Sequence, residues 1–374
     1  MIFVSHVSTM SIRRNFTKNN QKVPGSTGDF AFNGMDIRTT IKNWMLPIAM
    51  VTGASLYLIY NVMPQPVHKA GPFLSHVVAI VQPLLIFSML FLTFCRIEPK
   101  DLKPHRWHWW LLLIQGGLFA GLGMLAVWVI SAFPENSHDK VVLIESAMLC
   151  LICPTATAAA VVTRKLGGDV AGITTYTMLI NLVTAVLVPL VVPLIHPMAG
   201  MDFWTAFSMI IARIFPLLIF PCMAAWIVRY LAPRLHKKLL SYPDLAFYLW
   251  AVALTLAITV TTKSIANSTM SLALLSMMAL VSLVCCVLQF MAGRFVGNRY
   301  KPRRSDVSPD VEARGKEMRK VTAGQALGQK NTVFAIWMGY TFMTPETAIV
   351  GGLYSIWHNF YNSWQLYRAG KNGV

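Results

Sequence analysis

Charged residues are scarce in this sequence: Asp, Glu, Lys and Arg make up 13% of its 374 residues, whereas 55% are hydrophobic. A typical soluble domain carries about 25% charged residues. The shortage therefore argues against a water-soluble fold. Apolar runs of about 20 residues, each long enough to cross roughly 30 Å of hydrocarbon, recur along the chain. The sequence predicts an integral, multi-pass membrane protein.

Two kinds of chemical site are also missing from the sequence. Cys150 and Cys153 have metal-like spacing, but no second cysteine pair or histidine partner lies nearby. The six thiols are therefore interpreted as small hydrophobic side chains. No residues assemble a nucleophile, a base and an oxyanion site. We expect neither an enzyme nor a metal-binding protein.

Ten apolar segments are present, with ends uncertain by several residues. They lie near residues 43–62, 73–95, 107–132, 141–163, 170–194, 203–229, 246–262, 270–293, 321–344 and 346–367. The predicted fold class is an all-α membrane protein with ten transmembrane helices.

The formal charge of +17 follows the membrane topology. If the N-terminus is cytoplasmic, all but five of the 32 Lys and Arg residues lie in cytoplasmic segments. Lys69, Lys140 and Lys263 lie outside, and Arg213 and Lys330 lie within spans. This asymmetry predicts that both termini are cytoplasmic, in a bacterial inner membrane. The basic charge therefore needs no nucleic acid as a partner, and the oligomeric state stays open.

The ten segments divide into two repeats of five, 43–194 and 202–367. An odd number of spans makes the second repeat enter the bilayer from the opposite face, which is an inverted repeat. The other segments are predicted to be an N-terminal tail at 1–42, whose natural start is expected at Met35, a basic cytoplasmic linker at 294–320 and a cytoplasmic tail at 368–374.

The fourth segment of each repeat carries helix-breaking residues. Pro154 interrupts the first repeat, and Gly324 and Gly328 occupy a similar depth in the second. Proline removes a backbone donor and glycine weakens a helix, so both segments are expected to unwind near the middle of the membrane. Unwound backbone is tolerated there only where protein encloses it or where it lines a cavity. Pro154 alone is typical of an ordinary kink, but the matching pair favours a transporter.

Lys330 follows Gly328 inside the ninth segment. An ammonium at the bilayer centre costs about 2.5–3.5 kcal/mol on insertion scales. We expect it to face a wet cavity, a counter-charge or a substrate; the alternative is a side chain that extends to the interface. Glu145 and Glu346 are interpreted as solvated helix ends, and Arg213 as a structural or interface-seeking residue.

Several motifs together resemble the bile acid:sodium symporter family. They are PLLIFSMLFLTFCRIEPKDLK, Gln115, CPTATAAAVVTRKLGGD, GQKN and SIWHN, in that order. The resemblance implies a core domain of crossed helices four and nine and a panel domain that includes helices one and six. It also implies alternating access for an organic anion, such as a bile acid or a smaller carboxylate, in the lipid bilayer.

The chain departs from the family at the sodium ligands. Ala159 and Ala160 stand where the family has a serine and an asparagine, and Ile173 replaces a hydroxyl. Gln325 replaces a carboxylate, and Lys330 replaces an asparagine. Sodium needs several oxygen ligands, and a second cation nearby repels it. The departures predict that Lys330 replaces the sodium ion. Two mechanisms stay open. A permanently charged Lys330 implies exchange, whereas a titrating Lys330 implies proton-coupled symport.

The resemblance also indicates the remaining site residues. The predicted substrate-binding residues are Lys330, Thr157, His358 and Asn331, and the residual cation-site residues are Gln115, Gln325, Gln329 and Thr177. The predicted function is a sodium-independent organic anion transporter without a cofactor. The alternatives are a conventional sodium-coupled symporter and a membrane receptor that binds the anion without transporting it.

Overall fold

The structure is a computed structural model. It describes residues 37–64, 69–197, 200–242, 244–267, 270–300 and 309–371. Contacts divide the chain into two units, residues 1–43 and 44–374. The first unit contributes the start of helix α1, and the site described below lies within the second.

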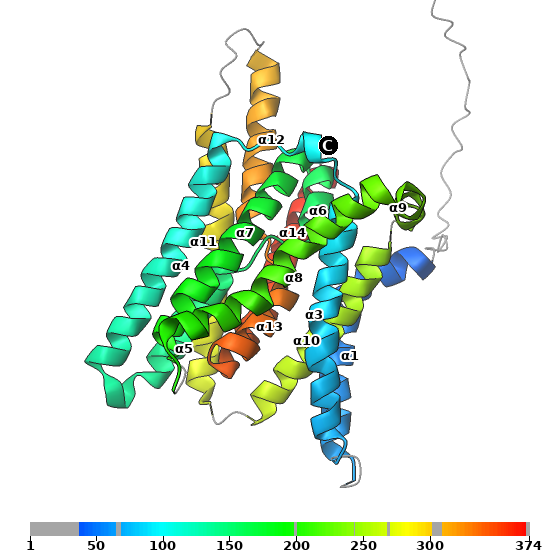
Figure 1. Ribbon diagram of the computed structural model, residues 1–374. Coiled ribbons are helices and arrows are strands. Elements are labelled where there is room, and N and C mark those ends of the chain that lie inside the picture. Colours follow the sequence, from blue (N-terminus) through cyan, green and yellow to red (C-terminus); the bar gives the residue numbers. More distant parts are fainter. Residues whose placement is uncertain are drawn as a thin grey trace, which may run out of the picture. The chain divides into compact units, whose positions relative to one another are not determined.

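Helices account for nearly all of the described residues (Figure 1). They are α1 (Ile37–Val62), α3 (Gly71–Cys95), α4 (Arg106–Ala132), α5 (His138–Ile152), α6 (Ala159–Lys165), α7 (Val170–Ile195), α8 (Phe203–Leu231), α9 (Pro233–Leu240), α10 (Leu245–Asn267), α11 (Leu272–Arg299), α12 (Pro309–Gly328), α13 (Thr332–Phe342) and α14 (Ala348–Lys371). Three short 3₁₀ helices lie at Pro99–Asp101, Pro134–Asn136 and Pro345–Thr347.

Six of these helices are long and apolar enough to cross a membrane: α3, α4, α7, α8, α10 and α11. Three of the four other predicted spans differ for identifiable reasons. The apolar part of α1, Ile48–Val62, is shorter. The fourth and ninth segments are each divided into two helices, α5 with α6 and α12 with α13. The all-α class and the multi-pass membrane character are confirmed.

Polar side chains cap the first turns of helices α8 and α11. The Asp202 carboxylate accepts hydrogen bonds from the backbone of Trp204 at 3.0 Å and of Thr205, at the start of α8. Ser271 accepts from Leu274 N–H at 3.1 Å at the start of α11. These bonds satisfy backbone donors that have no partner within the helix. Each cap therefore fixes where its helix enters the fold.

We call α1, α3, α8 and α10 the panel helices. α3 packs against both α8 and α10, and Figure 1 shows α1, α3 and α10 side by side. α1 reaches α10 through the Thr259 hydroxyl, which donates to the Gly53 carbonyl at 3.0 Å. A Cβ at Gly53 would lie 2.6 Å from the Thr255 carbonyl oxygen, so the two backbones touch. The panel helices thus form one packed group.

The remaining long helices surround the two divided segments. α4 packs against α5 and α7, and α11 packs against α5, α12 and α14. The contact between α11 and α12 is very close. A Cβ added at Gly293 would lie 2.3 Å from the Ala323 carbonyl oxygen, and one at Gly297 would lie 2.4 Å from that of Arg319. Only glycine permits this backbone approach.

The predicted linker at 294–320 is helical over most of its length. α11 continues to Arg299 and α12 already begins at Pro309, while residues 301–308 lie outside the described ranges. The helical ends are held by packing between α11 and α12 and by the Glu317 carboxylate, which accepts hydrogen bonds from Arg294 and Lys320 at 2.9 Å each. The basic composition suggested a linker, whereas tertiary contacts extend both helices.

Candidate functional site

The two divided helices meet where their backbones are unwound. Ala156 N–H donates to the Gln329 carbonyl at 3.0 Å, and Asn331 N–H donates to the Pro154 carbonyl at 2.8 Å. These bonds form an antiparallel bridge between Thr155 and Lys330. Backbone groups that the helix ends release are therefore paired across the crossing, as burial in a membrane protein requires. We call residues 153–158 and 329–331 the crossing segments.

Lys330 lies at the centre of the crossing segments and is only 2% exposed. Its ammonium donates a hydrogen bond of 3.0 Å to the carbonyl of Leu151 in the last turn of α5. Carbonyls in the last turn of a helix have no partner within that helix and carry its negative dipole end. Among the described residues no carboxylate forms an ion pair with Lys330. The helix end is thus the partner of this charge.

The space beside Lys330 is small. A void of about 10 Å³ is lined by residues that include Cys150, Cys153, Thr332 and Tyr354. Such a volume holds about one water molecule. The structure therefore encloses the lysine, whereas the sequence predicted a lysine that faces a wet cavity, a counter-charge or a substrate.

The other predicted substrate residues lie around the crossing. Thr157 is half-buried between α5 and α6. Asn331 caps α13, because its side-chain oxygen accepts from Phe334 N–H at 3.2 Å. His358 in α14 is 4% exposed, its Nδ1 has no partner, and its ring meets that of Tyr354 edge-on.

Two predicted cation ligands already have protein partners. The Gln115 amide donates to the carbonyls of Ile152 and Cys153 at 3.3 and 3.2 Å, and its oxygen accepts from the Tyr176 hydroxyl at 2.7 Å. Thr177 donates to the Ile173 carbonyl one turn earlier in α7. Gln115 therefore supports the end of α5 with both ends of its amide.

Two other glutamines keep free oxygens. Gln325 donates to Asn362 at 3.0 Å and to Gln365 at 2.8 Å, while its own oxygen has no partner. The buried Gln329 side-chain oxygen has no partner either. Ala159 and Ile173 are fully buried, and their side chains have no oxygen to offer.

Gly324 does not break a helix, so that prediction is wrong. α12 continues through Gly324 and ends at Gly328, next to the crossing. The reason for glycine at 324 is packing, because a Cβ there would lie 2.8 Å from the Arg294 side chain. Pro154 lies in the non-helical stretch between α5 and α6.

The interpretation of Glu145 as a solvated helix end is also wrong. Its side chain is fully buried. The carboxylate pairs with His196 Nε2 and accepts from Thr344 N–H at 3.0 Å. Glu145 thus ties α5 to the end of α7 and to the turn before α14. Tertiary partners replaced the water expected at this helix end.

A large cavity lies between the panel helices and α13. It has a volume of about 720 Å³, within the usual range of roughly 300–1,000 Å³ for small-molecule sites. Apolar side chains such as Leu56, Leu74, Val78 and Trp337 line it. We call this space the panel cavity. Because it has the volume of a ligand site and walls from five helices, it is the candidate binding site.

The charged and amide side chains in the panel cavity come from three different helices. Arg213 of α8, Lys263 of α10 and Gln82 of α3 line it. Lys263 donates to the Ser75 hydroxyl at 3.1 Å. The sequence interpretation of Arg213 as structural missed this grouping. A charge inside a span is itself a signal of function, but only the fold brings the three residues together.

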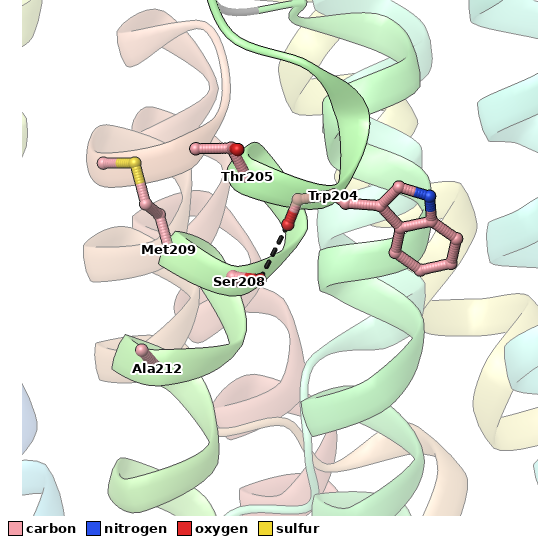
Figure 2. A pocket seen from close by; sticks show the side chains of 5 residues that line it. All are labelled: Trp204, Thr205, Ser208, Met209 and Ala212. Carbon is pink, nitrogen blue, oxygen red and sulfur yellow. Dashed lines mark hydrogen bonds between the residues drawn. The ribbon is translucent and has the colours of Figure 1, made fainter.

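A second hollow, of about 450 Å³, follows α8 near its start. Figure 2 shows its lining side chains, which all come from this one helix. The Ser208 hydroxyl donates back to the Trp204 carbonyl at 2.7 Å. Within the described part of the chain, no second element lines this hollow, so it offers less to a ligand than the panel cavity.

Comparison with known families decides the class of the protein. Residues 83–294 match the Sodium Bile acid symporter family. The chain belongs to this family. No curated protein matches it. As a member of the sodium bile acid symporter family, the chain is a multi-pass membrane transporter of organic anions. Its partners are a small organic anion substrate and the membrane lipids.

Proposed function

We propose that this transporter carries an organic anion by alternating access without sodium, and that Lys330 supplies the positive charge of the missing ion. One observation carries the proposal: the Lys330 ammonium lies 3.0 Å from the Leu151 carbonyl at the end of α5. In transporters with broken helices, the C-terminal ends of half-helices coordinate the coupling cation. A lysine ammonium in this position is proposed to provide that charge from the protein itself.

Electrostatics supports the replacement. Two unit positive charges 4 Å apart repel by about 4 kcal/mol at an effective dielectric constant of about 20. A sodium ion beside Lys330 would meet this repulsion. The chain offers little to offset it, since Gln325 stands where the family has a carboxylate.

The ligand set points the same way. Sodium, a hard cation, prefers several oxygen ligands. Ala159, Ala160 and Ile173 contribute no side-chain oxygen, and both ends of the Gln115 amide are engaged. Among the predicted cation-site glutamines, Gln325 and Gln329 keep side-chain oxygens without a partner. The loss of these side-chain oxygens supports the proposal that no sodium ion is bound here.

The architecture that we propose has ten crossings in two inverted repeats of five, at 43–194 and 202–367. Six long apolar helices, two divided segments, α1 and α14 supply the ten. The antiparallel bridge between the fourth and ninth segments supports the pairing of equivalent positions. The distribution of basic residues supports cytoplasmic termini in a bacterial inner membrane.

We propose a path for the anion from the panel cavity to the crossing along α13. Trp337 lines the cavity and follows Lys330 by seven residues, which is roughly 10 Å along a helix. Thr157, Asn331 and His358 surround the crossing and are proposed to contact the anion when alternating access opens it. Lys330 is proposed to balance its charge.

Counterflow of radiolabelled taurocholate in proteoliposomes tests the transport proposal. Exchange is expected to be equal in sodium and choline buffers, because the charge at the crossing is built in. Loss of exchange in choline, restored with saturable dependence on sodium, would identify a conventional sodium-coupled symporter. Taurocholate binding without counterflow would identify a receptor. Liposomes without protein provide the blank.

A further inference from the structure

The panel cavity contains two cations and no acid. Arg213 and Lys263 line it, and its lining includes neither Asp nor Glu. Arg213 lies ten residues after the first residue of α8, which is roughly 15 Å along the helix. Among the described residues no carboxylate forms an ion pair with Arg213 or Lys263. A charge inside a span, such as that of Arg213, normally pairs with another group, so the two cations favour a negatively charged ligand.

Gln82 gives an independent indication of a ligand. Its side chain lines the same cavity and is only 4% exposed, yet its Nε2 donor has no hydrogen-bond partner. A buried donor without a partner is destabilising. Arg213, Lys263 and the Gln82 amide nitrogen are all donors, so a ligand rich in acceptor oxygens suits them.

The cavity walls determine the rest of the ligand. Leu56, Leu74, Val78 and Trp337 cover faces of a volume of about 720 Å³. An anion of only a few heavy atoms would leave these apolar walls in contact with water, which is unfavourable. A ligand with a bulky apolar body buries that surface.

We propose that the panel cavity binds an amphipathic organic dianion, with Arg213, Lys263 and Gln82 as its recognition residues. The inference deepens the proposed transport function and rests on it for its role in the cell. Two negative charges neutralise the two cations, whereas a monoanion leaves one positive charge without compensation. The apolar walls beside the two cations lower the local dielectric constant, so an uncompensated charge is less favourable there than in bulk water. Dianions are therefore selected over monoanions with the same apolar body.

Binding of taurocholate and its 3-sulfate ester to purified protein tests this selectivity. The two compounds share one steroid body and differ by one negative charge. Isothermal titration is expected to give about tenfold or more tighter binding of the sulfate ester, because the second charge gains a charge-assisted hydrogen bond. Equal affinity, or tighter binding of taurocholate, overturns the proposal.

Variants of Arg213 and Lys263 test whether these residues cause the preference for the dianion. Arg213→Met and Lys263→Met are each expected to remove the preference for the dianion, and Arg213→Lys to retain it. Lys140→Met and Arg299→Met are matched controls outside the cavity, where each cation lies over an aromatic ring. They should leave the affinity ratio unchanged. Equal loss of the ratio in the controls contradicts the assignment.

The two proposals fail in different ways. Tighter binding of the sulfate ester without counterflow supports the cavity assignment and rejects transport. Equal binding and equal counterflow of both compounds reject the dianion site and support transport. Gln82→Leu adds a third measurement. It should weaken the binding of both compounds, because it removes a hydrogen-bond donor without changing the charge of the cavity. If Arg213→Met does not fold, the comparison in the wild-type protein still decides the proposal.

Discussion

At the residue scale, Lys330 exchanges hydration by water for a single backbone carbonyl. Insertion of a lysine at mid-membrane costs about 2.5–3.5 kcal/mol. A hydrogen bond from a charged group returns about 1.5–3 kcal/mol, and the adjacent C-terminal end of α5 adds a favourable dipole contribution. The near balance explains how the chain keeps a buried ammonium with the Leu151 carbonyl as its partner.

Lys330→Asn should therefore disturb function more than stability. The variant removes the cost of the buried charge but leaves the Leu151 carbonyl without its donor, at about 1–3 kcal/mol. We expect a small change in Tm and a loss of sodium-independent counterflow of about tenfold or more. Lys330→Arg keeps the charge and should retain exchange. Melting curves and counterflow in choline buffer measure both effects.

The variants Lys330→Asn and Lys330→Arg also test whether transport is coupled to protons. A titrating lysine makes wild-type uptake respond to an imposed pH gradient, and Lys330→Arg, which does not titrate in the accessible range, should remove that response. Lys140→Asn and Lys140→Arg are controls at an exposed lysine that contacts Phe133. Unaltered affinity and pH dependence in Lys330→Asn would contradict the role of this residue.

Sequence reasoning found some functional residues and missed others for physical reasons. Lys330 was detectable because charge within an apolar segment is costly wherever the segment lies. Arg213 gave the same signal, but its significance depends on Lys263 and Gln82, which come from other helices. Long-range neighbours such as these leave no trace in local spacing.

At the element scale, the two divided helices illustrate how proline and glycine differ as signals. Proline removes a backbone donor in any environment, and Pro154 lies where the chain leaves α5. Glycine weakens a helix but also lets two backbones approach. Gly324 serves the second purpose, next to Arg294 of α11. The sequence alone does not separate these two uses.

The packing of α11 against α12 yields a stability prediction. A Cβ at Gly293 would lie 2.3 Å from the Ala323 backbone oxygen, so Gly293→Ala must push the helices apart. Overpacking of this kind costs about 1–3 kcal/mol. We expect a lower Tm than that of the wild-type protein. Thermal unfolding of the purified protein in detergent measures it.

Gly117→Ala is the matched control for this prediction. Gly117 lies within α4, and a Cβ there would meet no atom within 4 Å. Alanine favours a helix by about 1 kcal/mol over glycine, so the control should keep or raise the Tm. Equal melting temperatures for the two variants would show that α11 and α12 separate freely.

At the scale of the whole molecule, the panel cavity connects the two groups of helices. Four of its walls are panel helices, and the fifth is α13, which leads directly from the crossing. Alternating access requires the panel helices to move against the crossing helices. Rigid-body movement of this kind opens and closes such a cavity. The solvent accessibility of one residue on α13 therefore reports the movement.

Thr341→Cys tests this movement, because Thr341 lines the panel cavity. A membrane-impermeant methanethiosulfonate reagent should label the new thiol in sealed vesicles, and saturating taurocholate should slow the labelling by filling the cavity. The native thiols are buried apart from half-buried Cys285 and give a low background.

Met124→Cys on α4 is the control: its side chain is 61% exposed in the protein alone, but lipid should cover it and prevent labelling. The positive-inside distribution further predicts labelling from the periplasmic face. Labelling of Thr341→Cys that is insensitive to taurocholate would separate the cavity from the transport path.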